Sequence, residues 1–319
     1  MNLRKILLSI YMIFFKTESS KNGSAIIIVL IIFVIAGILS TFMLGLARRN
    51  IMFSKLLEDK AYANIGADST IEKVKFFFST GEYKSFYVKN NLDGFPNIVY
   101  FDGRIQKLEK DNVSIEIQGS GGLISVWGID YAALKNLLIE EGINEIKVKK
   151  IISSIKDWYD KDNLPSFDGA EYPYYKFKGC RYVPRNSYGI QSIYELKDVN
   201  GLDNKTFSLI EKFLILSPNW RYNINVMNSE MLSVVFGFSK DIAESLIKEK
   251  ENGNCLKISD IKKYTQISNF DNLKYSSFST LVVRVKVVYN FKEATEKKVC
   301  VIDFRLTPEK PFRVLKWED

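Results

Sequence analysis

The sequence of 319 residues contains no histidine at all. That absence excludes Ser-His-Asp and Cys-His catalysis, histidine general bases and most catalytic zinc sites. Three cysteines are present, Cys180, Cys255 and Cys300, and no two of them form a CxxC motif. Neither a zinc ribbon nor a thioredoxin-like site is therefore expected, although one disulfide beside one free thiol stays open. We predict that the protein is not an enzyme.

Nucleotide-binding loops are also missing. The short glycine-rich run from Gly119 to Gly122 lacks the third glycine of a dinucleotide loop and the Lys-Ser/Thr pair of a phosphate loop, so it predicts a turn. The net charge is +8, from 45 basic and 37 acidic residues. The lysines are scattered, which favours an ordinary solvated surface over a nucleic-acid or anionic-lipid patch.

A long apolar run is the strongest feature that is present. Residues 24–47 carry no charge, and a helix of this length extends about 36 Å, enough to cross a bilayer core of roughly 30 Å. The preceding residues have a basic start and an apolar decamer, but no A-x-A-like cleavage site follows that decamer, which argues against a secretory signal peptide. A plain signal anchor is the alternative interpretation.

The helical pattern continues beyond the apolar run, up to about Gly81. Its apolar residues recur mostly every three or four positions, as expected for a helix that packs one face on a soluble domain. They are Phe53, Leu57, Ala61, Ile65, Ile71, Val74 and Phe78. We therefore expect a single helix that serves first as a membrane anchor and then as a spine.

The start of the run resembles the processing site of the type IV pilin and type II secretion pseudopilin superfamily, in which a basic leader ends in glycine. Lys21-Asn22-Gly23 followed by Ser24 matches that pattern. The resemblance implies cleavage by a prepilin peptidase after Gly23, with Ser24 as the methylated mature terminus. A start at Met12 would give a leader of more usual length.

Most members of that superfamily carry glutamate as the fifth mature residue, where this chain has Ile28. An ionisable group inside a membrane helix costs several kcal/mol unless it has a partner, so a subunit with no neighbour to meet can dispense with it. This departure is typical of the general secretion pathway protein K family. It implies a subunit at the tip of the pseudopilus.

The soluble part changes character twice. Strand-like runs lie between Phe95 and Trp127, with Asp102-Gly103 as a hairpin-turn signal; helical segments follow to about Leu273, and strands return after it. Helical segments are expected at YAALKNLLIEEG, EIKVKKIISSIKDWYD, SIYELKDV, NKTFSLIEKFL, SEMLSVVFG and KDIAESLIKEKENG. In the K family a large α-helical domain is inserted into the pilin sheet, and the order here matches it.

Several short motifs strengthen the resemblance to the K family. DWYDKD at 157–162 with GAE at 169–171, the segment at 192–201 with its Glu195-Leu196 pair, Asn223-Ile224-Asn225, and the terminal VLKWED all resemble family motifs in the same order. The predicted class is α+β. Its parts are a leader (1–23), an anchor and spine helix (24–81), the first part of a pilin-like antiparallel sheet (82–128), an inserted helical domain (129–275) and the second part of the sheet (276–319).

The loop from Asp160 to Glu171 predicts a calcium site. Carboxylates occupy its first, third, ninth and twelfth positions: Asp160, Asp162, Asp168 and Glu171. That spacing imitates the ligand set of an EF-hand, but Pro165 replaces the glycine at the sixth position, so an ordinary EF-hand is excluded. Resemblance to the calcium-binding domain of the K family supports a structural calcium ion. Asp157 is a weaker candidate, and a solvated acidic turn is the alternative.

Two segments, 196–214 and 234–250, resemble helix-hairpin-helix units, which bind DNA phosphates through a Gly-x-Gly turn. Asp203 and Ser239 replace the second glycine of each turn, and the negative charge of Asp203 opposes phosphate binding. We interpret both segments as packing units and expect no nucleic-acid partner. A membrane-tethered minor pilin or a DNA receptor of a type IV or competence pilus is the alternative function.

Taken with these residues, the resemblance implies a minor pseudopilin of type II secretion, anchored in the inner membrane by one helix, with its soluble part in the periplasm. It would cap the pseudopilus and initiate its assembly. The implied partners are the other minor pseudopilins, the major pseudopilin, the inner-membrane assembly platform and the prepilin peptidase.

Overall fold

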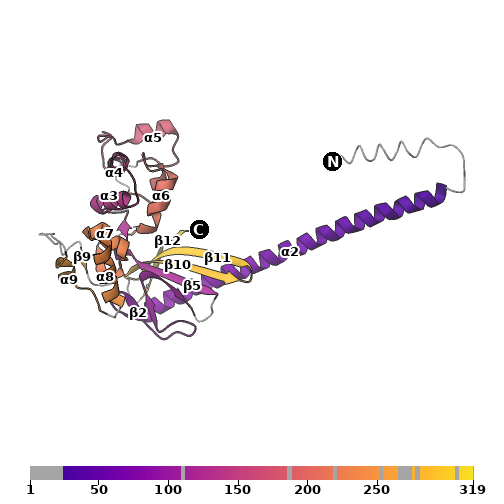
Figure 1. Cartoon of the computed structure of the whole chain (residues 1–319), viewed down its shortest axis with the longest axis horizontal. Helices are drawn as coiled ribbons and strands as arrows, with labels where there is room; N and C mark the ends of the chain where they lie inside the picture. Colours follow the sequence, from indigo (N-terminus) through magenta and orange to yellow (C-terminus); the bar gives the residue numbers. More distant parts are fainter. Residues whose placement is uncertain are drawn as a thin grey trace. The chain divides into compact units, whose positions relative to one another are not determined.

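The structure, a computed structural model, describes residues 24–108, 112–184, 189–217, 221–251, 254–264, 275–276, 281–305 and 309–318 (Figure 1). The expected leader and its last residue, Gly23, lie outside this set. The chain forms two compact units, residues 1–59 and 60–319. Helix α2 (Ser24–Thr80) begins in the first unit and ends in the second.

The first unit consists, in its described part, of the apolar portion of α2. An 18-residue window of this helix has a mean hydropathy of 3.0, and no residue within that window is buried. By length and composition, α2 is able to cross a membrane. Residues 24–47 carry no charge on any side of the helix, as a lipid-facing segment requires.

In the second unit, the end of α2 packs on an antiparallel sheet. Ile71, Val74 and Phe78 are fully buried there, as the periodic pattern predicts. Ile65 is 63% exposed, however, and Ala63 and Ala67 occupy the contact positions in its place. Ile65 lies on the other side of the helix from these positions, and the helix approaches the sheet closely here, since a Cβ atom on Gly66 would lie 2.4 Å from the ring of Tyr289. Small residues allow that approach where a larger apolar residue would not.

The sheet beside α2 has five strands in the order β12-β11-β10-β5-β4. They are β4 (Asp102–Lys107), β5 (Val113–Gly119), β10 (Val282–Phe291), β11 (Ala294–Asp303) and β12 (Arg313–Glu318), and all neighbours are antiparallel. A second sheet contains β1 (Glu82–Tyr83), β2 (Tyr87–Lys89) and β3 (Ile98–Tyr100). One apolar core joins both sheets to the helix.

The segment between β5 and β10 leaves and re-enters the sheet at neighbouring strands, and it has a core of its own. Its α-helices are α3 (Tyr131–Glu140), α4 (Glu145–Tyr159), α5 (Tyr172–Lys178), α6 (Asn204–Ile210), α7 (Ser229–Phe236), α8 (Lys240–Glu251) and α9 (Ile258–Lys262). Helices α3 to α6 gather at one end of this unit (Figure 1). The observed α+β class, with a long apolar N-terminal helix and antiparallel sheets, confirms the predicted class.

Short elements complete this segment. They are η1 (Ser120–Gly122), β6 (Ile124–Ser125), η2 (Ile193–Asp198), η3 (Glu211–Phe213), β7 (Leu214–Ile215), β8 (Tyr222–Asn223), η4 (Ile224–Val226) and β9 (Tyr275–Ser276). Strand β6 pairs with β7 and strand β8 with β9, both in parallel. The run LISVW therefore does not contribute to the main sheet.

One sequence-based expectation is wrong. Asp102-Gly103 is not a hairpin turn: it begins β4, where the register shifts between Asp102 and Ile105 and Gly103 has a φ of +83°. The chain changes sheets at this point, from β3 to β4, and a bulge with glycine provides the sharp bend. The helical segment expected at SIYELKDV is confirmed as the 3-10 helix η2.

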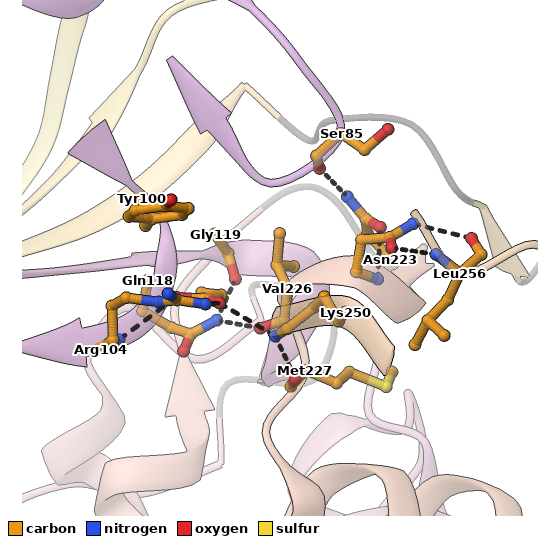
Figure 2. A network of polar contacts seen from close by, with 12 residues as sticks. Ser85, Tyr100, Arg104, Gln118, Gly119, Asn223, Val226, Met227, Lys250 and Leu256 are labelled. Atoms are coloured by element: carbon orange, nitrogen blue, oxygen red, sulfur yellow. Dashed lines mark hydrogen bonds and ion pairs between the residues drawn. The ribbon is translucent and has the colours of Figure 1, made fainter. Parts of the chain in front are cut away.

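A buried polar joint connects the helical segment to the sheet (Figure 2). Lys250 of α8 lies 2.9 Å from the Asp102 carboxylate, and both side chains are only 3% exposed. Arg104 holds the same carboxylate at 2.7 Å. Burial alone would raise the pKa of Asp102, but Arg104 and Lys250 hold it below its usual value. The charge that the fold buries here is thus matched by cations of the chain itself.

Amide side chains extend this joint. Gln118 of β5 donates to the carbonyl oxygens of Gly119 and Val226, the latter at 2.7 Å. Asn223 donates to the carbonyl of Ser85, and Asn225 both donates to and accepts from the backbone of Leu256 (Figure 2). The predicted Asn-Ile-Asn motif therefore satisfies backbone groups that the sheet and helices leave unpaired.

Candidate functional site

The candidate site lies in the loop that joins α4 to α5. Helix α4 starts at its cap Asn144, whose side chain accepts from the backbone of Lys147, and ends at Asp160. Helix α5 starts at its cap Glu171, with Pro173 in the first turn, and ends at Gly179. The rings of Trp158 and Tyr175 meet edge to face, with centroids 4.9 Å apart. Both ends of the loop are therefore fixed by the core.

Three carboxylates converge at the ends of this loop. Asp157, Asp160 and Glu171 each offer one oxygen, and these three oxygens lie within 4.8 Å of one another. Asp157 is fully buried and Glu171 is 3% exposed. The loop folds back on Asp157, which accepts from the backbone N–H of Ser166 at 3.0 Å. A Cβ atom at position 169 would lie 1.9 Å from the Asp157 carboxylate, so only glycine fits there.

The electrostatics of this group are unfavourable without a cation. Burial, and then the charge of Asp160, raise the pKa of Glu171 to about 7. Burial, Asp162 and Asp157 raise the pKa of Asp160 as well. Among the described residues, neither carboxylate oxygen of Glu171 has a hydrogen-bond partner, and Oδ1 of Asp160 has none. Buried anionic oxygens without partners are costly, so the fold stores repulsion here.

A divalent cation would relieve that repulsion. Calcium binds six to eight oxygens from carboxylates, carbonyls and water, and it tolerates irregular geometry. Three converging carboxylates with unsatisfied buried oxygens supply the carboxylate part of such a ligand set. The residues present therefore fit calcium, with Asp157, Asp160 and Glu171 as the carboxylates that would hold it.

The structure groups only part of the predicted ligand set. Asp160 and Glu171 are brought together, while Asp162 and Asp168 are exposed and lie outside the close group. Asp162 accepts from the backbone of Leu164, and Asp168 has a φ of +64°. Asp157, the weaker candidate in the sequence, takes the central buried place. Its signal was its position one helical turn before Asp160, on the face of α4 that enters the core.

The two hairpin-like segments use their turns for packing. Asp203 caps α6 by accepting from the backbone of Thr206 at 2.8 Å, and it pairs with Lys147 at 2.7 Å. The hydrogen bond from Lys147 and that from Thr206 hold the pKa of Asp203 far below its usual value. Gly237 ends α7 at a φ of +71°. A capping carboxylate occupies the helix start where a phosphate would bind, which supports the packing interpretation.

Comparison with known proteins gives three findings. Residues 125–219 match the family described as type II secretion system (T2SS), protein K. A segment of 108 residues is 31% identical to a type II secretion system protein K of Pectobacterium carotovorum subsp. carotovorum; it covers 32% of this chain and 31% of that relative, so the match spans about a third of the relative's length.

The third finding is structural. A chain in the crystal structure of the GspK-GspI-GspJ complex from the enterotoxigenic Escherichia coli type 2 secretion system superposes with a TM-score of 0.55, at 14% identity. The match covers 85% of this chain and 98% of that chain, and at this identity it shows a shared fold. The carboxylate loop lies inside the segment that matches the family. Residues 125–219 are therefore similar in sequence to the type II secretion system protein K family, in agreement with the motifs in this segment.

Proposed function

We propose that this protein is a structural minor pseudopilin that stands at the tip of the type II secretion pseudopilus and initiates its assembly. The observation that carries the proposal is the combination of a protein K segment, inserted between neighbouring strands, with a spine helix that has Ile28 at the fifth mature position. A glutamate there would need a partner inside the membrane, whereas isoleucine needs none. The absence of this glutamate is consistent with a subunit at the tip, which has no neighbour above it.

In this proposal, α2 crosses the inner membrane once and the second unit lies in the periplasm. Prepilin peptidase cuts after Gly23, and the new amine of Ser24 is methylated. The other minor pseudopilins and the major pseudopilin pack beside or below this subunit, on the inner-membrane assembly platform. The relative whose solved structure is a complex with GspI and GspJ supports partners of the minor pseudopilin class.

Calcium has a structural role in the proposal. The ion would hold the loop 160–171 against α4 by balancing the charges of Asp157, Asp160 and Glu171. It would thereby present the exposed outer part of the loop in one conformation. No step of chemistry is required of it.

Mass spectrometry of the full-length protein, extracted from membranes of cells that have the prepilin peptidase, tests the processing step. A methylated terminus at Ser24 is expected, and cells without the peptidase should keep the leader. An intact leader in both strains contradicts the processing. Exposed Cys255 offers a topology test: a membrane-impermeant maleimide should label it after the outer membrane alone is permeabilised.

Electron microscopy of overproduced pseudopili tests the tip position. We expect an epitope tag on this chain to be found at one end of each filament, and we expect fewer filaments when the chain is absent. Label along the whole shaft contradicts the tip position. The variant Ile28→Glu should shift part of the label into the shaft, while Ile27→Val, a matched change beside it, should leave the label at the tip.

A further inference from the structure

The face of the five-stranded sheet that points away from α2 is cationic over its open half. Paired residues of antiparallel strands lie on the same face, so the register places Lys107 with Ser114, Lys286 with Glu116, and Lys297 with Val288. The alternate residues of β5 and β10, including Ile115 and Val287, form the core against α2. These pairs place three lysines and one glutamate on the surface, and Glu318 of β12 occupies the register position opposite Val299 at its border.

The other half of this face is covered by the helical segment, and its acids are already neutralised. Asp102 is held by Arg104 and Lys250, and Asp303 is held by Arg305 and Arg313. These carboxylates do not offset the charge of the open half.

A cleft of about 240 Å³ lies at the boundary between the open and covered halves. Four of its lining side chains are basic, two are acidic, and Tyr194 and Val299 are among the others. The basic ones are Lys212, Arg284, Lys286 and Lys297, and the acidic ones are Glu116 and Glu211. The cleft therefore keeps an excess of positive charge.

The cations of the cleft differ in how far the chain already uses them. Arg284 donates to the carbonyl oxygens of Lys212 and Leu214, and Lys286 lies 2.7 Å from Glu116. Lys297 is exposed and makes no hydrogen bond or ion pair to any residue that the structure describes. Its amine is available to a ligand from outside, and Lys286 and Arg284 reinforce the potential around it.

The spacing of these groups fits an extended peptide better than a compact anion. Phosphate is bound where several donors converge on one point. Here Lys286 and Lys297 lie on the neighbouring strands β10 and β11, and Val288 and Val299 separate them. Ile105 on the edge strand β4 is 70% exposed beside the same row. Cationic positions alternating with apolar ones complement a strand that alternates carboxylates with apolar side chains.

We infer that this face, with the cleft at its border, is a docking site for an extended acidic segment of a partner protein, one in which aspartate or glutamate alternates with apolar residues. Lys297 would pair with a carboxylate of that segment, Lys286 would add positive charge beside its ion pair with Glu116, and Tyr194, Val299 and Ile105 would contact the apolar side chains of the segment. The site belongs to the second unit of this chain whatever place the protein has in a secretion machine.

Fluorescence anisotropy with the full chain in detergent micelles tests the site. The probe is a short labelled peptide that alternates glutamate with valine, compared with peptides that alternate glutamine or lysine with valine. We expect salt-sensitive binding of the glutamate peptide alone. The variant Lys297→Glu should weaken it by about tenfold, because attraction becomes repulsion. Lys149→Glu changes the same charge on an exposed site of α4 and should leave the affinity within about twofold.

Three results would overturn the inference. Equal weakening by Lys149→Glu would mean that the peptide responds to net charge alone. Equal binding of the glutamine peptide would remove the role of the carboxylates. Complete competition by millimolar inorganic phosphate would identify a compact anion site in place of a peptide site. Circular dichroism of each variant should match the parent chain, so that loss of folding is recognised as such.

Discussion

Two groups of buried carboxylates in the second unit have opposite surroundings. At the joint, Asp102 is enclosed by Lys250 and Arg104, and its pKa is held below the usual value. In the α4–α5 loop, Glu171 is enclosed by Asp157 and Asp160, and burial with their charge raises its pKa to about 7. Asp102, Asp157 and Glu171 are almost inaccessible to water, and Asp160 is partly buried.

The difference shows which buried carboxylate is compensated by cations of the chain itself and which group needs an external cation. A buried ion is tolerated when a partner and hydrogen bonds compensate its lost hydration. The joint has that partner within the chain, so it connects the helical segment to the sheet without an external ligand. The loop has no such partner among the described residues, so an external cation is the natural complement.

The largest effect is expected at the joint. Lys250→Met removes a cation that is almost completely buried and leaves Asp102 with Arg104 alone, which should lower the free energy of unfolding by about 3 kcal/mol. Denaturant unfolding of the full chain in detergent measures this. Lys248→Met changes an exposed lysine of the same helix and should cost less than about 0.5 kcal/mol. Equal losses in the two variants would remove the special role of the pair.

Calcium should produce the next largest effect, and only at the loop. At 100 times its dissociation constant the ion should stabilise the chain by about 2.7 kcal/mol, seen as a rise in Tm that chelator reverses. Glu171→Gln and Asp157→Asn should abolish the rise. The exposed Asp168→Asn should keep it. If Asp168→Asn abolishes the rise and Asp157→Asn does not, the ligand set read from loop spacing is the correct one.

The two groups should also respond to pH in opposite directions. Glu171 in the metal-free chain keeps its proton up to about pH 7, whereas in the unfolded chain it loses the proton near 4.5. Its contribution is therefore fully present below 4.5 and is lost as pH rises to about 7, by an amount on the order of 2 kcal/mol.

Asp102 behaves in the reverse sense. Its folded pKa lies below the unfolded value of 3.8, so its contribution is present above that pH and is lost as pH falls through the folded pKa. Unfolding measured across pH, with and without calcium, separates the two groups. Glu171→Gln should flatten the change between 4.5 and 7. A metal-free stability that rises over this interval in the parent chain would refute the assignment.

The smallest effect is expected for Gly169→Ala. The added Cβ would collide with the Asp157 carboxylate and displace it from the N–H of Ser166, at a cost of about 1 kcal/mol and with weaker calcium binding. Gly189→Ala is the matched control, because its Cβ would meet only ordinary contacts at 3.9 Å and beyond. Undiminished calcium affinity in Gly169→Ala would show that Asp157 is not a ligand.

Much of the architecture follows from local pattern. The apolar run of α2, the alternating strands β5, β10 and β11, and the amphipathic helices α4 and α8 were all predicted, because hydrophobic periodicity reports directly on which face is buried. The family resemblance depends on short motifs, and the structure shows which contacts their residues make. The side chain of Asn225, for example, forms hydrogen bonds with both the N–H and the carbonyl group of Leu256.

Other features could be decided only by tertiary contacts. The side of α2 that contacts the sheet includes Gly66, which lies against Tyr289, a residue more than 200 positions away, so Ile65 is left exposed on the other side. The bulge at Asp102-Gly103 exists because the chain changes sheets there. Neither contact has a local signal in the sequence.

The carboxylate loop shows the same division. The sequence by itself determined that acids crowd between α4 and α5, and that the chain has no histidine to serve another chemistry. Only the tertiary structure decided that Asp157, Asp160 and Glu171 converge while Asp162 and Asp168 face solvent. The physical reason is that spacing along a chain sets which residues are near one another in a loop, whereas burial against a core sets which of them lose their water and need a cation.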